Sequence, residues 1–152
     1  MVYTEVKERN GRKYFYRVRS VRRGYKFSKD RVYLGQNLPK EKLEKKEDVA
    51  DKKLLKEKIE KGLRQIKPKI IQILKKNNVK KAGIFGSYSR GEQTKNSDID
   101  ILIEPPKKIG LGFIRIAIEL EDKLGKKVDL VSYNGIDALL RNKILSQEIR
   151  IL

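Results

Sequence analysis

Apolar and polar positions alternate along the first part of the chain. In residues 12–21, aromatic and β-branched side chains take turns with basic ones, which is the two-residue period of a β-strand. The Asn-Gly dipeptide at 10–11 favours a type I′ turn, so residues 2–7 and 12–21 are predicted to pair as a hairpin. An apolar triplet at 32–34, followed by glycine, predicts a third strand. Residues 1–36 are therefore predicted to form a three-stranded antiparallel β-meander.

The period of the apolar positions changes after residue 36. Leucine and isoleucine recur every three or four residues, at Leu55, Ile59, Leu63 and Ile66. This spacing predicts an amphipathic helix over 49–66. A Lys/Glu-rich stretch before it is also predicted to be helical, with Asn37 as its cap and Pro39 in its first turn. Pro68 marks the start of another helix, which Asn77 and Asn78 end. Residues 37–66 are interpreted as a helical linker.

The last part of the chain alternates between strand and helix patterns. Strands are predicted at 79–85, 99–103 and 128–131, and helices are predicted at 109–124 and 136–146. Such alternation is typical of an α/β (α+β) domain, in which helices cover a sheet. We assign residues 67–152 to this domain. The organisation predicted from the pattern is thus a meander over 1–36, a linker over 37–66 and a sheet domain over 67–152.

Composition limits the chemistry of the chain. It has no cysteine and no histidine, so any catalytic site must rest on carboxylates, hydroxyls and cations. The net charge of +18 has two explanations that remain open: attraction to phosphate groups, or the lysine-rich composition of a thermophile. The sequence has no apolar run of membrane-spanning length and no apolar stretch behind its N-terminus. A cytoplasmic protein without membrane association is therefore expected.

Three features between residues 80 and 130 indicate phosphate chemistry. Gly86-Ser87 ends a predicted strand, where backbone amides and a hydroxyl can hold phosphate oxygens, although an ordinary strand-to-helix turn has the same pattern. Asp98 and Asp100 share one face of a strand, and two such carboxylates favour Mg²⁺ between them unless both face solvent. Asp129 interrupts another apolar strand. It is either a third ligand that can also accept a proton, or an exposed acid.

These motifs resemble a known family. The runs Gly86-Ser87-Tyr88-Ser89-Arg90-Gly91 and Ser97-Asp98-Ile99-Asp100 are similar to the minimal nucleotidyltransferases, and Val128-Asp129-Leu130-Val131 resembles their third-acid strand. The resemblance covers residues 67–146 and implies the polymerase-β-like fold, with a mixed sheet flanked by helices. It further implies that Asp98, Asp100 and Asp129 bind one or two Mg²⁺ ions, that Gly86 and Ser87 contact the triphosphate of ATP, and that ATP supplies a nucleoside monophosphate to an acceptor hydroxyl. Arg90 is either a phosphate contact or a structural arginine.

The resemblance also suggests an acceptor. Minimal members of the family resemble antitoxins whose partner is a HEPN-type RNase toxin, which implies adenylylation of a tyrosine on that partner. The alternative substrates are an RNA 3′ end and a small hydroxylated molecule. A hypothesis of another class makes the chain a basic nucleic-acid-binding protein, through Arg17, Arg19, Arg22 and Arg23 of the meander, whose cations alternate with aromatic rings. Exposed sheet edges also favour a homodimer.

Overall fold

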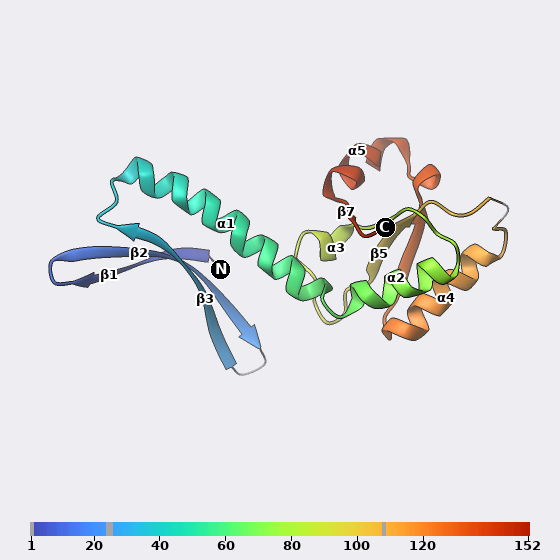
Figure 1. Cartoon of the computed structure of the whole chain (residues 1–152), viewed down its shortest axis with the longest axis horizontal. Coiled ribbons are helices and arrows are strands. Elements are labelled where there is room, and N and C mark those ends of the chain that lie inside the picture. The colour runs from blue at the N-terminus through green and yellow to red at the C-terminus, as the bar shows by residue number, and fades with distance from the viewer. Residues whose placement is uncertain (1, 24–25, 108) are drawn as a thin grey trace. The chain divides into compact units, whose positions relative to one another are not determined.

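The chain folds into two compact units. The computed structural model describes residues 2–23, 26–107 and 109–152, and side chains are described outside 22–26. One unit comprises Met1–Lys58 and the other Ile59–Leu152 (Figure 1). The long helix α1, Lys40–Leu63, begins in the first unit and ends in the second. Among the described residues, none of the helices is both long and apolar enough to span a membrane.

The first unit contains the predicted meander. Its strands β1, Val2–Arg9, β2, Arg12–Arg23, and β3, Lys26–Gln36, pair antiparallel in the order β1-β2-β3. The Asn-Gly turn has positive φ at both residues, 51° and 71°, as a type I′ turn requires. β3 begins six residues earlier than predicted. Its first half is polar, and only its pairing with β2 makes it a strand.

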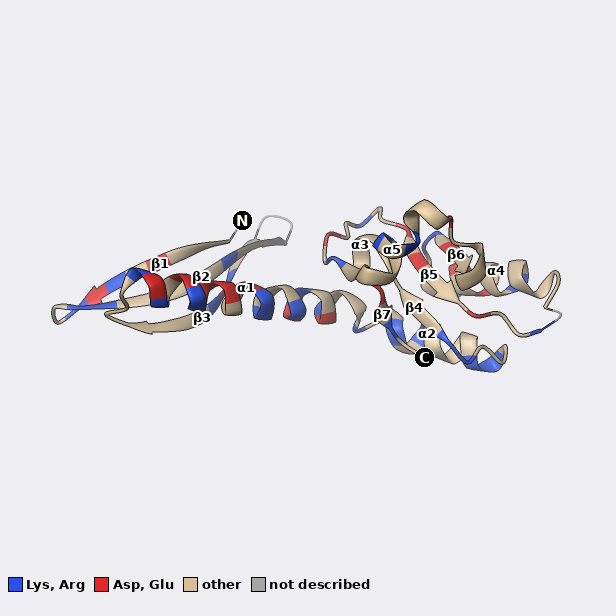
Figure 2. Ribbon diagram, turned by 90° about the horizontal axis from the view of Figure 1, so that it is seen from above, with Lys and Arg blue, Asp and Glu red and all other residues tan. Residues whose placement is uncertain are grey.

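Helix α1 also begins earlier than its apolar period indicates. Its first half is rich in charges of both signs, as Figure 2 shows. Asn37 is not its cap, contrary to the prediction. The Asn37 backbone N–H donates to the Lys13 carbonyl, its side-chain oxygen accepts from the Lys13 N–H, both at 2.8 Å, and its φ is 47°. Asn37 therefore extends the pairing with β2 at the end of the sheet, before helix α1 begins.

The second unit is built on a mixed four-stranded sheet. Its strand order is β6-β5-β4-β7, with bounds of Val128–Ser132, Ile99–Ile103, Ala82–Ile84 and Ile149–Arg150. β5 and β6 run parallel, whereas β4 is antiparallel to both β5 and β7. This is the mixed sheet that the family resemblance implied. The predicted strand at 79–85 shrinks to three residues, and β7 is too short for its pattern to be read from the sequence.

Helices cover both faces of this sheet. The larger core packs α2, Ile66–Lys76, and α4, Gly112–Leu124, against Ile99, Ile101 and Ile103 of β5. The opposite face has a smaller core in which Leu102 packs with Tyr133 and Ile136, beside α5, Ala138–Gln147. Since strand residues alternate in direction, Asp100 lies on the same face as Leu102. The one acidic side chain of β5, that of Asp100, thus belongs to the less covered face.

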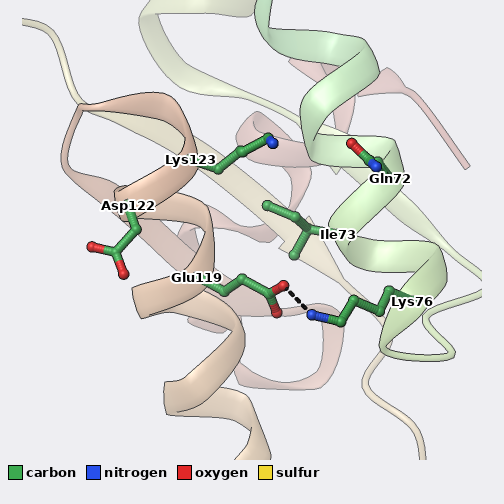
Figure 3. A pocket seen from close by; sticks show the side chains of 6 residues that line it. All are labelled: Gln72, Ile73, Lys76, Glu119, Asp122 and Lys123. Carbon is green, nitrogen blue, oxygen red and sulfur yellow. Dashed lines mark hydrogen bonds and ion pairs between the residues drawn. The ribbon is translucent and has the colours of Figure 1, made fainter.

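A groove lies between α2 and α4, on the side of the larger core. It has a volume of about 420 Å³, and Figure 3 shows the ion pair between two of its lining residues, Lys76 and Glu119, which are 2.6 Å apart. Asn77 donates a second hydrogen bond to Glu119, at 3.2 Å. The face of the sheet that bears the acids is the opposite one, so this groove is not the candidate site.

Candidate nucleotidyltransferase site

The backbone at Gly86 is the centre of the candidate site. Gly86 directly follows the short loop after β4 and opens α3, Gly86–Ser89, with a φ of 66°. A Cβ placed there would lie 1.9 Å from Oδ2 of Asp100, a distance that no pair of unbonded atoms can adopt. The preceding residue, Phe85, donates its N–H to the Asp100 carbonyl at 3.0 Å. Only glycine lets the turn approach this carboxylate so closely.

The turn also supplies a hydrogen bond to Asp100. The Ser87 backbone N–H donates to its carboxylate, which favours the charged form. Burial has the larger effect and raises the pKa of Asp100 above its usual value, and the negative charge of Asp129 raises it further. Asp98 contributes in the same direction, while the cation of Arg90 opposes it. Asp100 is thus a half-buried carboxylate close to two other negative charges. A bound cation would reduce the repulsion among them.

Two of the three predicted carboxylates, Asp100 and Asp129, lie side by side on neighbouring strands, and the third, Asp98, comes just before β5. Asp100 and Asp129 are register partners across the parallel β5–β6 pair, and Asp98 precedes Asp100 by two residues. Asp98 and Asp129 are exposed. Within residues 2–23, 26–107 and 109–152, no three carboxylates are close enough to form a ready-made metal cage. An all-oxygen set of this kind nevertheless fits Mg²⁺, which usually takes only one or two carboxylates and completes its shell with water and phosphate.

Arg90 lies beside this group and is held on both sides. Its Nε donates to Glu92 at 2.7 Å, and its Nη1 donates to the side-chain oxygen of Gln147, at 2.9 Å. Gln147 ends α5, so this bond connects α3 to α5. Gln147 could not be predicted from the sequence, because it lies 57 residues from Arg90 and no local pattern indicates it. The arginine remains about 40% exposed, so it can still reach a ligand.

The basic residues predicted to bind nucleic acid have other surroundings. Arg17 forms a bidentate ion pair with Asp51, at 2.7 and 2.8 Å, and Arg19 is buried against the Leu54 carbonyl and Asp30. Both arginines fasten the sheet to α1. The side chains of Arg22 and Arg23 lie outside the described residues. Arg17 and Arg19 are therefore engaged with α1 and do not lie on an open surface, and the prediction for Arg22 and Arg23 is untested.

Comparisons with known proteins identify the family to which this fold belongs. Residues 68–152 match the model "Polymerase beta, Nucleotidyltransferase". A candidate protein adenylyltransferase of Methanocaldococcus jannaschii, MJ0435, is 50% identical over 92 residues, which is 60% of this chain and 99% of that protein. Protein adenylyltransferase MntA of Thermococcus cleftensis is 35% identical over 74 residues, 48% of this chain and 75% of that protein. The chain therefore belongs to the polymerase-β nucleotidyltransferases, within the minimal nucleotidyltransferase family of MntA-like protein adenylyltransferases.

Solved structures agree with this assignment. A candidate minimal nucleotidyltransferase has a TM-score of 0.52 and 31% identity, covering 57% of this chain and 90% of that one. The crystal structure of a toxin–antitoxin with AMP-PNP has a TM-score of 0.51 and 30% identity, covering 57% and 72%. The MJ0435 match spans almost all of that relative, so about 40% of this chain has no counterpart in it. The family assignment thus rests on the second unit alone.

Proposed function

We propose that the chain transfers AMP from ATP to a tyrosine hydroxyl of a HEPN-type toxin partner and so acts as an antitoxin. The observation that carries the proposal is the close approach of the Gly86 turn to Asp100, with Asp129 as the register partner of that carboxylate. This arrangement places the turn that opens α3 beside two carboxylates, and a Mg²⁺ held by those carboxylates would let a triphosphate bind next to the turn. The relatives named as protein adenylyltransferases support AMP as the group transferred.

Each residue has a proposed role. Gly86 and Ser87 bind the triphosphate through the backbone and the hydroxyl. Asp98, Asp100 and Asp129 would hold one or two Mg²⁺ ions, which when bound neutralise charge on the phosphate oxygens. Arg90, fixed by Glu92 and Gln147, orients a phosphate group. The Mg²⁺ and the roles of these residues are proposals that the family resemblance and the chemistry of the donor set support.

The proposed reaction balances without any further reactant. The acceptor oxygen attacks the α-phosphorus of ATP, and a new phosphorus–oxygen bond forms as the bond from that phosphorus to the bridging oxygen breaks. Pyrophosphate leaves with the bond electrons. The proton of the acceptor hydroxyl passes to Asp129, which is exposed and therefore accessible to an incoming side chain.

One solved relative supports a toxin as the partner. The structure of a toxin–antitoxin with AMP-PNP contains an ATP analogue, and it shares the fold of the second unit. A protein acceptor is consistent with the open edge of the acidic face, because Asp98 and Asp129 are exposed. We extend this relationship to the present chain: its own toxin partner is the acceptor, and a tyrosine of that partner receives AMP.

The test uses ATP labelled at the α- or the γ-phosphate, with Mg²⁺ and a co-expressed HEPN-type partner. Label from the α-position, but not from the γ-position, is expected on the partner, and Tyr→Phe at the modified residue should abolish it. Asp100→Asn should stop transfer, whereas Asp122→Asn, which removes an exposed acid of α4, should not. If the α-label goes only to an RNA 3′ end or a small hydroxylated molecule, the acceptor in this proposal is wrong. If no acceptor is labelled, the activity itself is wrong.

A further inference from the structure

The meander has two faces with different surroundings. Thr4, Arg17 and Arg19 bond to Glu47, Asp51 and the Leu54 carbonyl of α1, so their side chains lie on the α1 face. The register pairs Thr4 with Arg17 and Glu5 with Tyr16. Neighbouring residues of a strand point to opposite faces of the sheet. The residues next in sequence to Thr4, Arg17 and Arg19 therefore point to the other face, which we call the open face.

Four tyrosines gather on the open face. Tyr16 is the register partner of Tyr33 and of Glu5, and its ring centroid lies 5.3 Å from that of Tyr33, with an angle of 49° between the planes. Tyr3 and Tyr14 have the same orientation in the ladder, as partners of Val18 and Lys7. Tyr33 is 54% exposed, whereas Tyr3, Tyr14 and Tyr16 are partly buried. Exposed rings on a sheet can stack with unpaired bases, and the free energy gained by such stacking is largely independent of base identity.

The charge of the open face is complementary to a phosphate backbone. Among the side chains that the structure describes, the ladder places one acid, Glu5, and five cations on this face. The cations are Lys7, Arg9, Arg12, Lys29 and Arg31. Glu5 is already bonded to Arg31, at 3.1 Å. Two lysines lie over rings, Lys7 at 5.7 Å from the Tyr16 centroid and Lys29 at 5.6 Å from that of Tyr3. Each pair thus combines a stacking surface with a cation that can bind the adjacent phosphate.

We propose that the open face binds single-stranded RNA. Rings spread over a sheet can stack only on bases that are not already paired, which disfavours a duplex. Of the two nucleic acids, RNA is the one that commonly presents unpaired bases in loops and ends, where aromatic side chains bind them. This face belongs to the unit outside the family match, and the inference does not depend on the proposed adenylyl transfer.

The role of the rings can be tested by fluorescence anisotropy with fluorescein-labelled U15 RNA and the full chain. Tyr33→Leu is expected to weaken binding about tenfold, the loss of one stacking platform, whereas Tyr33→Phe keeps the ring and should bind like the wild type. Circular dichroism checks that both variants are folded. Equal affinities for Tyr33→Leu and the wild type would overturn the proposal, because a binding mode without stacking does not need this ring.

The role of the cations can be tested through salt dependence. Lys7→Gln/Lys29→Gln removes two proposed phosphate contacts and should lower the slope of log affinity against log salt by about 1.4. The matched control, Lys42→Gln/Lys45→Gln, removes the same charge from exposed positions of α1 and should leave the slope nearly unchanged. Equal changes for the two pairs would indicate only a general effect of net charge and would overturn the assignment to this face.

Competitor nucleic acids decide the class of ligand. Unlabelled U15 RNA should displace the probe at least tenfold more effectively than duplex RNA or duplex DNA of the same length. If single-stranded DNA competes as effectively as single-stranded RNA, the assignment to RNA is wrong. If duplexes compete equally, binding does not depend on stacking with unpaired bases. A chain that binds none of these at low salt would refute the proposal altogether.

Discussion

The two units of this chain are stabilised in different ways. The second unit has a core of 14 buried residues in which almost every side chain is aliphatic. The first unit buries few large apolar residues, mainly Val18, Leu34 and Leu54, and joins sheet to helix through Arg17 and Arg19. A unit that is packed tightly by apolar side chains can hold costly clustered acids on one face. The meander, with fewer buried apolar groups, depends on its charged network.

The largest expected effect is on the acids of the second unit. Asp98→Asn/Asp100→Asn should lower AMP transfer by at least about 10²–10³-fold, the loss typical of removing a preorganised electrostatic group. The substitution removes negative charges that repel each other, so the unit should stay folded. Labelled ATP gives the rate and circular dichroism the fold. Activity within tenfold of the wild type would show that the family motif is not the catalytic centre.

Gly86→Ala is expected to have the next largest effect. The new Cβ would collide with the Asp100 carboxylate, and a φ of 66° costs an alanine about 1–2 kcal/mol in the left-handed region. Transfer should be lost together with ATP binding, while the melting temperature falls only modestly. Gly125→Ala is a matched control, since Gly125 has a similar φ of 62° and nothing lies within 4 Å of a Cβ there. Equal losses of transfer in the two variants would argue against a specific role for the Gly86 turn.

Arg19→Ala should destabilise the first unit and leave the second intact. It removes a buried guanidinium that bonds Asp30 and the Leu54 carbonyl. Because Asp30 is only partly buried, we expect a loss of about 2 kcal/mol, less than the cost of breaking a fully buried pair. Five of the seven tyrosines lie in the first unit, so tyrosine fluorescence during urea unfolding reports mainly on it.

The control for this prediction is on the open face. Arg31→Ala breaks a more exposed ion pair with Glu5 and should lower the free energy of unfolding much less than Arg19→Ala does. If both arginines have the same small effect, the charged network does not hold the sheet to α1, and the contrast between the units disappears.

The smallest expected effect is a pH dependence in the second unit. Hydrogen bonds from Lys76 and then Asn77 lower the pKa of Glu119 below its ordinary value. The pair therefore stabilises the fold at neutral pH, and its contribution disappears as the pH falls through the folded-state pKa. Glu119→Gln should lower the free energy of unfolding by less than about 1 kcal/mol at pH 7. It should have no effect at a pH low enough to protonate Glu119 in both the folded and the unfolded state. Urea unfolding at pH 7 and at that low pH tests the prediction. A loss of stability that persists at low pH contradicts it.

Local patterns predicted most of the elements correctly. The meander, the helices and the three longer strands follow from periodicity, because such patterns depend only on neighbouring residues. The errors lie where the partner decides the structure. The polar first half of β3 becomes a strand only by pairing with β2, and Asn37 bonds Lys13 across the sheet instead of capping α1.

By itself, the sequence determined which carboxylates and which glycine could form the site, because their spacing is that of a family motif. Only the tertiary structure decided that Asp129 lies opposite Asp100, that Gln147 holds Arg90, and that Arg17 and Arg19 face α1 and leave the tyrosines on the other side. Alternation assigns residues to two faces of a strand, but it does not say which face a helix covers. Which face the helix covers depends on contacts between side chains that are far apart in the chain. A local pattern contains no information about such contacts.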